Sequence, residues 1–190
     1  MTLDLEKHRF IVSTEERIRQ HESFIPAPVP KRTEWTMWCD LNETNGHLDS
    51  DLQFVAVSQE SHWQAMFDLR RQVEKAYGLT DQAILEQIIA DIKCKTDALA
   101  GCWYLVKLAD QFIGEIGLIP FTYQGQKVGR LQDVDIVPSY QGKGYGRQLL
   151  RHLMSVAREQ QYEALCLMAL ANDWPKDWYQ KLGFNKVGET

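Results

Sequence analysis

The 190-residue sequence has no surplus of positive charge, no long apolar run and no closely spaced cysteines. Its 21 lysines and arginines against 26 aspartates and glutamates give a net charge of −5, which argues against a nucleic-acid partner held by a basic surface. A membrane span needs ~20 apolar residues, so we expect no membrane partner. The first residues lack the basic and then apolar order of a secretory signal. We therefore expect a cytoplasmic protein.

The cysteines and histidines give no sign of a metal site. Cys39, Cys94, Cys102 and Cys166 are scattered, without the spacing of metal ligands. We interpret them as buried, reduced thiols. The five histidines have no partner spacing either, so the sequence predicts no metal cofactor.

The composition is that of a folded protein with room for one domain. Hydrophobic residues make up 44% of the chain and aromatic residues 11%, enough for a sizeable core, and one domain takes ~100–200 residues. Residues 1–51 carry six basic and ten acidic residues, so most of the negative charge lies there. We predict an N-terminal arm over residues 1–51 and a single domain over residues 52–190.

The arm mixes several local signals. Residues 13–16, Ser-Thr-Glu-Glu, predict the start of a short helix. Three prolines between residues 26 and 30 predict an extended linker. Residues 34–41 alternate well enough for a strand, and Asn45-Gly46 predicts a turn after it.

From residue 52 the hydrophobic pattern predicts an α/β domain, a mixed sheet flanked by helices in the order β-α-α-β-β-β-α-β-α. The last β-α-β unit is expected to be a parallel crossover. The strands are expected at 52–57, 103–108, 112–119, 129–137 and 163–171, and the helices after Ser61, Thr80, Gly146 and Trp174.

A glycine-rich turn lies between a predicted strand and a predicted helix. Gly142, Gly144 and Gly146 let the backbone curl so that several N–H groups point to one place, at the positive end of a helix dipole. Residues 139–158 add four basic residues and no acidic one. The turn predicts a pyrophosphate site; the alternative is a structural turn without a ligand.

Other phosphate motifs fail on spacing. A dinucleotide fingerprint would need glycine at Arg147, and a P-loop would need serine or threonine after Gly142-Lys143, where Gly144 stands.

The segment Gln141-Gly142-Lys143-Gly144-Tyr145-Gly146, preceded by Val134-Asp135-Ile136-Val137-Pro138, resembles the signature of the GNAT superfamily of acetyl-CoA-dependent N-acetyltransferases. A second segment agrees: Asn172, Trp178, Tyr179, Lys181, Gly183 and Phe184 match the family's second pattern in spacing, with Pro175 replacing its usual alanine. The resemblance covers residues 52–187 and leaves the arm outside.

The resemblance implies a binding role for each of these segments. Gln141, Gly142, Lys143, Gly144, Tyr145, Gly146 and Arg147 would hold the CoA pyrophosphate, and Val134, Asp135, Ile136 and Val137 would pair with the pantetheine arm. Ile136 would offer its amide to the thioester carbonyl, and Asn172 would reach the pantetheine. The two parallel strands would splay apart, with the thioester in the gap.

Amide formation from a thioester requires a neutral amine, and an amine with a pKa of ~10.4 must first lose a proton. The family often places its base on the strand near Gln132 and Asp133. Gln132 cannot be a base, so we expect Asp133 in that role, with Asp135 or a water chain as alternatives. Asp133 and Asp135 are two residues apart and would face one side of a regular strand. They could instead only orient a cationic substrate.

The departing CoA thiolate needs a proton, and Tyr179 stands where the family places that acid. The alternative is that Tyr179 only packs its helix onto the sheet. Arg70-Arg71 are interpreted as a solvated helix face, with substrate contact as the alternative.

The sequence thus predicts transfer of an acetyl group from acetyl-CoA to a primary amine by direct attack, with no metal. The acceptor, a small molecule or a peptide, stays open, and a non-catalytic acyl-CoA-binding domain is the alternative function. Because many relatives are dimers, we expect a homodimer.

Overall fold

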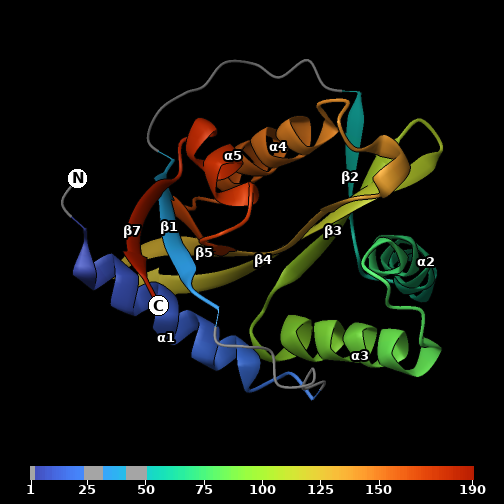
Figure 1. Ribbon diagram of the computed structural model, residues 1–190, viewed down its shortest axis with the longest axis horizontal. Helices are drawn as coiled ribbons and strands as arrows, with labels where there is room; N and C mark the ends of the chain where they lie inside the picture. Colours follow the sequence, from blue (N-terminus) through green and yellow to red (C-terminus); the bar gives the residue numbers. More distant parts are fainter. Residues whose placement is uncertain (1–2, 24–31, 42–50) are drawn as a thin grey trace.

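The computed structural model describes residues 3–23, 32–41 and 51–190, which form one seven-stranded sheet and five α-helices (Figure 1). The strands are β1 (Glu34–Asp40), β2 (Leu52–Ala56), β3 (Cys102–Leu108), β4 (Gln111–Tyr123), β5 (Gln126–Ile136), β6 (Ala164–Leu170) and β7 (Asn185–Glu189). The helices are α1 (Leu5–Arg19), α2 (Glu60–Ala76), α3 (Gln82–Ala98), α4 (Tyr145–Glu159) and α5 (Pro175–Lys181), with a 3₁₀ turn at Pro138–Tyr140.

The sheet is mixed, with strand order β2-β3-β4-β5-β6-β1-β7. β5 and β6 are parallel, and every other neighbouring pair is antiparallel. The connection between the parallel strands is α4, as expected for a crossover. The predicted α/β class with a mixed sheet flanked by helices is therefore confirmed.

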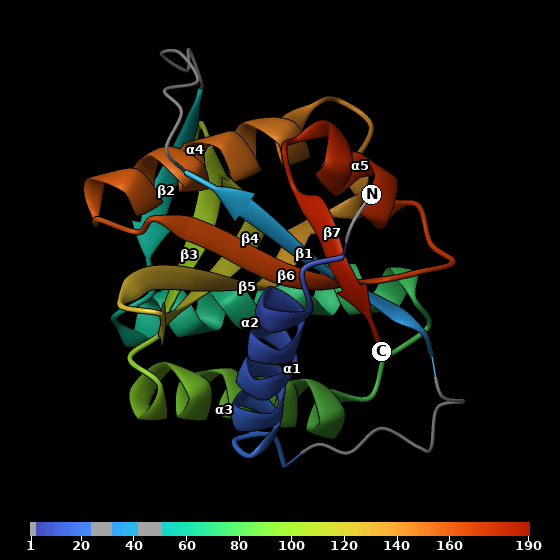
Figure 2. The same cartoon turned by 90° about the vertical axis from the view of Figure 1, so that its left-hand side faces the viewer.

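Helices cover both faces of the sheet (Figure 1). α4 buries Leu149, Leu150, Leu153, Met154 and Ala157, the set that its helical spacing predicts, against one face. α2 and α3 bury their apolar stripes against the other face, over β3 and β4. α1 lies on that second face too, across β1, β6 and β7 (Figure 2).

β1, which lies within the predicted N-terminal arm, is part of this sheet. β1 pairs with β6 from Glu34–Leu170 to Asp40–Ala164, and on its other side with β7. The sequence-based division at residue 51 places β1 outside the domain, whereas the structure places it between two strands from the C-terminal third. Its apolar residues explain this position, because Met37 and Trp38 are buried on opposite sides.

The N-terminal helix begins earlier than expected. A start at 13–16 is wrong: α1 begins at Leu5, where the side chain of Asp4 caps the first turn. Thr14 lies inside the helix, and its hydroxyl donates to the Ile11 carbonyl at 2.7 Å. A threonine that bonds back to its own helix resembles a cap in sequence without being one.

Three further differences are local. β7 is absent from the predicted order, and α2 begins at Glu60, before Ser61, after an N-cap residue without a side-chain hydrogen bond. Among the cysteines, Cys94 is exposed rather than buried. The predicted proline linker and the Asn45-Gly46 turn lie outside the described residues.

Candidate functional site

The parallel strands β5 and β6 pair over only three residue pairs, the last of them Arg130 with Cys166. Beyond this point β5 continues with β4 as its partner and β6 with β1. The strands therefore diverge, and a cavity of about 260 Å³ lies at the divergence. Five elements, α1, β1, β5, β6 and α5, contribute its walls: Glu15, Glu34, Arg130, Leu131, Gln132, Asp133, Val134, Leu167, Met168 and Tyr179.

The end of β5 presents backbone groups to the open side. The Val137 N–H donates to the Ile113 carbonyl of β4 at 2.8 Å. Because successive amides of a strand point to opposite edges, the N–H of Ile136 points away from β4, toward the side that β6 has left. The Gln141 side chain donates to the Ile136 carbonyl at 2.8 Å and ties the following turn to this strand end.

The turn before α4 leaves room for a ligand. Gly142 and Gly144 have φ values of +74° and +87°, and a Cβ on either would meet nothing within 4 Å. Gly144 is the N-cap of α4, and no side chain caps the helix. Free amides at the positive end of a helix dipole can receive a phosphate. The residues present thus fit the pyrophosphate site expected from the sequence.

Basic side chains surround this turn. Lys143 and Arg147 are exposed, and the Lys143 ammonium donates to the Ser139 carbonyl at 2.9 Å. Tyr145 and Gly146 are half-buried. A Cβ on Gly146 would lie 3.4 Å from the Trp178 ring, so this part of α4 runs close to α5.

Tyr179 reaches the cavity from α5 and is only 9% exposed. Burial and the nearby charge of Asp135 raise the pKa of the phenol. The group therefore keeps its proton at neutral pH and can donate it. Asn172 lies exposed in the turn after β6 and is not among the residues that line the cavity.

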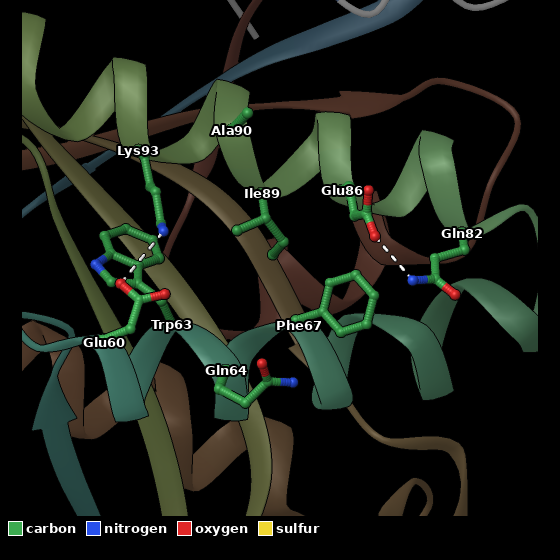
Figure 3. Close-up of a pocket in the computed structure, with 9 residues that line it drawn as sticks. All are labelled: Glu60, Trp63, Gln64, Phe67, Gln82, Glu86, Ile89, Ala90 and Lys93. Atoms are coloured by element: carbon green, nitrogen blue, oxygen red, sulfur yellow. Dashed lines mark hydrogen bonds and ion pairs between the residues drawn. The ribbon is translucent and has the colours of Figure 1, made fainter.

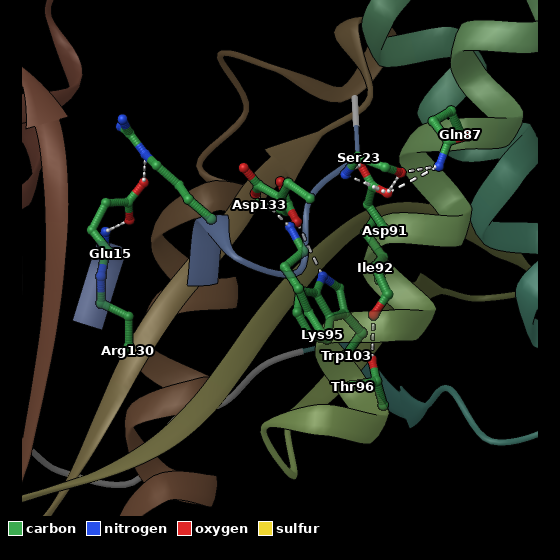
Figure 4. Close-up of polar contacts among 12 residues, drawn as sticks. Glu15, Ser23, Gln87, Asp91, Ile92, Lys95, Thr96, Trp103, Arg130 and Asp133 are labelled. Carbon is green, nitrogen blue, oxygen red and sulfur yellow. Dashed lines mark hydrogen bonds and ion pairs between the residues drawn. The ribbon is translucent and has the colours of Figure 1, made fainter. Parts of the chain in front are cut away.

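Asp133 lies at a bulge in β5. It has a φ of +48°, and the register with β4 shifts between Glu115 and Gly117. Its carboxylate accepts a hydrogen bond from the Trp103 indole at 3.2 Å (Figure 4). It also forms an ion pair with Arg70 at 3.2 Å. Burial acts to raise the pKa of Asp133, but the attraction of Arg70 and Lys95 and the indole hydrogen bond outweigh it, and the pKa is lowered.

A buried charge cluster continues from Asp133 toward α2. The guanidinium of Arg70, a residue 5% exposed, also contacts Asp135 at 3.2 Å, Glu74 at 3.3 Å and Glu115. Asp133 and Asp135 thus share one partner and one side of β5. Glu115 is fully buried, and burial, opposed by Arg70, raises its pKa from 4.5 to about 8.

Sequence reasoning missed Arg70 and Glu115. Arg71 is 61% exposed and pairs with Asp68, so the interpretation as a solvated face is right for Arg71 and wrong for Arg70. A signal for Arg70 exists in the spacing, since it falls between the apolar positions Met66 and Val73 of α2. Glu115 gives a comparable signal, a single acid in an apolar strand.

The side of the cavity opposite Tyr179 is formed by the N-terminal segment. Glu15 of α1 forms an ion pair with the buried Arg130 at 2.7 Å and with Arg19 at 3.0 Å. Glu34 of β1 lies 3.9 Å from Arg19, and burial together with the charge of Glu15 raises its pKa. The cavity thus connects a protonated phenol on one side of the sheet with carboxylates on the other.

A second hollow, of about 380 Å³, lies between α2 and α3 (Figure 3). Trp63, Phe67 and Ile89 line it, and Lys93 pairs there with Glu60 at 3.7 Å while its ammonium lies 5.2 Å from the Trp63 ring. Its charged groups satisfy one another, and it includes none of the sequence-predicted site residues. We therefore place the candidate site at the divergence of β5 and β6.

A family model matches the part of the chain that contains this candidate site. Residues 100–186 match the acetyltransferase (GNAT) domain. This segment of the chain is similar to a GNAT acetyltransferase domain. The matched segment contains β3 to β6, α4 and α5, and so includes both strands at the divergence, the glycine turn and Tyr179.

The curated relatives are similar to this chain over only part of their own length. The chain is 34% identical over 66 residues to an uncharacterized N-acetyltransferase, CgeE, from Bacillus subtilis, covering 35% of this chain and 26% of that protein. It is 36% identical over 64 residues to a glucosamine 6-phosphate N-acetyltransferase from Trypanosoma brucei brucei, covering 34% of this chain and 42% of that protein. The chain thus matches less than half the length of either curated relative.

Solved structures support the fold of the GNAT domain. A structure described as a predicted acetyltransferase with acetyl-CoA, from Clostridium acetobutylicum, aligns with a TM-score of 0.54 at 17% identity, covering 71% of this chain and 90% of that one. Among the described residues, no helix is long and apolar enough to cross a bilayer. Within the same ranges, no group of three or more histidine, cysteine or carboxylate side chains is arranged to hold a metal ion.

Proposed function

We propose that the chain transfers the acetyl group of acetyl-CoA to a primary amine by direct attack of the amine on the thioester. The divergence of β5 and β6, with a cavity that runs from Tyr179 to the carboxylates of α1 and β1, is the observation that carries this proposal. It gives the acyl donor and the acceptor separate approaches to one gap in the sheet.

The donor would bind on the side of α4. The amides from Gly142 to Gly146 and the side chain of Arg147, whose own N–H donates to the Gly144 carbonyl, would hold the pyrophosphate, and the Val134 to Val137 segment would pair with the pantetheine in place of the missing strand neighbour. The Ile136 N–H, directed away from β4, would then donate to the thioester oxygen as negative charge develops on it. Asn172 would contact the pantetheine from the turn after β6.

The chemistry needs one proton acceptor and one proton donor. As the amine nitrogen forms its bond to the carbonyl carbon, Asp133 would take the proton that the amine loses, directly or through water. The C–S bond then breaks, and Tyr179 would donate its proton to the thiolate of CoA. The raised pKa of Tyr179 keeps that proton available. The lowered pKa of Asp133 keeps its carboxylate ionised at neutral pH.

The acceptor would enter from the α1 side, past Glu15 and Glu34. These acids favour an amine that arrives as a cation, which agrees with the acidic character of residues 1–51. The homodimer expected from the resemblance stays a prediction, which light scattering of the purified chain checks.

The test is an acceptor screen read as release of free CoA thiol from acetyl-CoA. The panel contains spermidine, a lysine peptide, an amino-terminal peptide, an aminoglycoside and glucosamine 6-phosphate. Stimulated thiol release with one of them, abolished in Gly144→Val, supports the proposal. Tight acetyl-CoA binding without thiol release across the panel would favour a non-catalytic acyl-CoA-binding domain.

A further inference from the structure

Arg70 occupies an unusual place for an arginine. It lies on the buried face of α2, is 5% exposed, and its guanidinium contacts carboxylates from three elements: Glu74 on α2, Glu115 on β4, and both Asp133 and Asp135 on β5. One cation thus faces four acids, two of which belong to the strand segment that borders the cavity. Its neighbour Arg71 is a surface residue paired with Asp68.

Stability alone gives little reason for this arrangement. Burying an ion pair costs several kcal/mol of desolvation per ion, and apolar residues of similar size are often as stable. The hydrogen bonding is also incomplete, since Arg70 Nε, Arg70 Nη2 and both Glu115 oxygens have no partner of hydrogen-bond geometry among the described residues. A network of this kind is better explained by what it holds in place.

What it holds is the bulge of β5. Asp133 has a φ of +48°, a left-handed conformation that costs a non-glycine residue about 1–2 kcal/mol. Asp133 and Val134 together lie opposite one residue of β4, Asp135 pairs with Glu115 again, and one guanidinium bridges the carboxylates of Asp133 and Asp135. The Trp103 indole holds the other Asp133 oxygen. With these contacts the carboxylate of Asp133 has a defined position at the cavity.

We propose that Arg70 is the positioning residue of the acetyl transfer: by bridging Asp133 and Asp135 it fixes the bulge of β5 and with it the carboxylate that receives the amine proton. This inference rests on the proposed function, in which Asp133 is that base. Arg70 itself touches neither the donor nor the acceptor and acts through Asp133.

Charged groups from every neighbouring element act on Asp133. Arg70 from α2 and Lys95 from α3 attract it, and Lys95 is itself paired with Glu22, which follows α1, at 3.1 Å. Asp135 on β5 and Glu74 on α2 share the same guanidinium, and Glu115 on β4, whose pKa burial raises to about 8, keeps its proton at neutral pH. Without the charge of Arg70, only Lys95 and the Trp103 hydrogen bond still favour the ionised form of Asp133. Burial opposes it, so the pKa of Asp133 rises.

The test compares Arg70→Gln with the adjacent Arg71→Gln, using thiol release from acetyl-CoA with spermidine as the probe amine. We expect Arg70→Gln to lower kcat about tenfold to a hundredfold, with the acetyl-CoA KM within about twofold. The acidic limb of its kcat/KM profile should move to higher pH. Arg71→Gln should leave rate and profile unchanged, and Arg70→Lys should restore part of the rate.

A second measurement does not depend on turnover. The ¹³C signal of the Asp133 carboxyl, assigned with Asp133→Asn, should titrate at higher pH in Arg70→Gln than in the wild type or Arg71→Gln. Equal effects of the two arginine substitutions, or an Asp133 titration that does not move in folded Arg70→Gln, would overturn the inference. If Arg70→Gln does not fold, Arg70→Lys tests the inference instead. A wild-type rate and pH profile in that variant would show that a guanidinium bridging both carboxylates is not required.

These outcomes separate the inference from the proposed function. A wild-type protein that binds acetyl-CoA but releases no thiol with any amine of the screen contradicts the proposed function, and the inference falls with it. A wild-type protein that is active while Arg70→Gln keeps its rate and pH profile contradicts the inference alone.

Discussion

The proton on Glu115 offers a sharp test of the buried charge cluster. The change is Glu115→Gln, which keeps the size of the side chain and removes its titration. In the folded chain burial raises the pKa of Glu115 from 4.5 to about 8. In the unfolded chain the group is solvated and titrates near 4.5. The folded state therefore binds a proton that the unfolded state has released, over the whole interval between these values.

The sign follows from this difference in bound protons. The contribution of Glu115 to the free energy of unfolding is fully present below pH 4.5 and is lost as the pH rises toward 8. One pH unit corresponds to about 1.36 kcal/mol, so the interval of about 3.5 corresponds to about 5 kcal/mol in full. Between pH 5 and pH 8 the loss is about 3 to 4 kcal/mol, a large share of the about 5–15 kcal/mol of a typical domain.

The assay is urea unfolding at pH 5, 6, 7 and 8, on wild type, Glu115→Gln and the control Glu60→Gln, whose side chain is 86% exposed. We expect the free energy of unfolding of the wild type and of Glu60→Gln to fall with pH by about 3 to 4 kcal/mol more than that of Glu115→Gln. Parallel pH dependences in wild type and Glu115→Gln would refute the reasoning, because Glu115 would then be ionised in the folded state.

Three further changes test other parts of the site. Tyr179→Phe should lower kcat with spermidine about a hundredfold or more without weakening acetyl-CoA binding, and an unchanged kcat would remove Tyr179 as the acid. Gly117→Ala would place a Cβ 2.5 Å from the Trp103 ring and should destabilise the fold by about 1–3 kcal/mol; thermal unfolding checks this, and an unchanged Tm would contradict it. Glu34→Gln should raise the KM for spermidine about tenfold, whereas Glu16→Gln, on the exposed side of α1, should not; equal KM values would exclude Glu34 from the acceptor path.

The part of the site that depends on local signals was the part best predicted from the sequence. Pro138 ends β5, Gly142 and Gly144 supply the left-handed turn, and the apolar stripe of α4 follows at helical spacing. Each signal acts within a few residues, so the strand, turn and helix appear in the structure where they were expected. The divergence of β5 and β6 was expected only from the family resemblance.

The rest depends on contacts between distant residues. The bulge at Asp133 leaves no trace in the strand pattern, because the carboxylates that it places together are bound by Arg70, 63 positions earlier in the chain. The place of β1 is likewise set by pairing with β6, about 130 positions later. Periodicity predicted that residues 34–41 form a strand but contained no information about its partners.

The position of β1 between β6 and β7 has a consequence for how this chain folds during synthesis. Residues 34–40 are made well before both of their sheet partners, β6 and β7. Pairing over such sequence distances is slow, and domains fold as units during synthesis. The early strand, with its buried Met37 and Trp38, must therefore wait unpaired until β6 and β7 have been made. A ribosome stalled before β6 would hold a chain with an exposed apolar strand, which a protease or a chaperone could recognise.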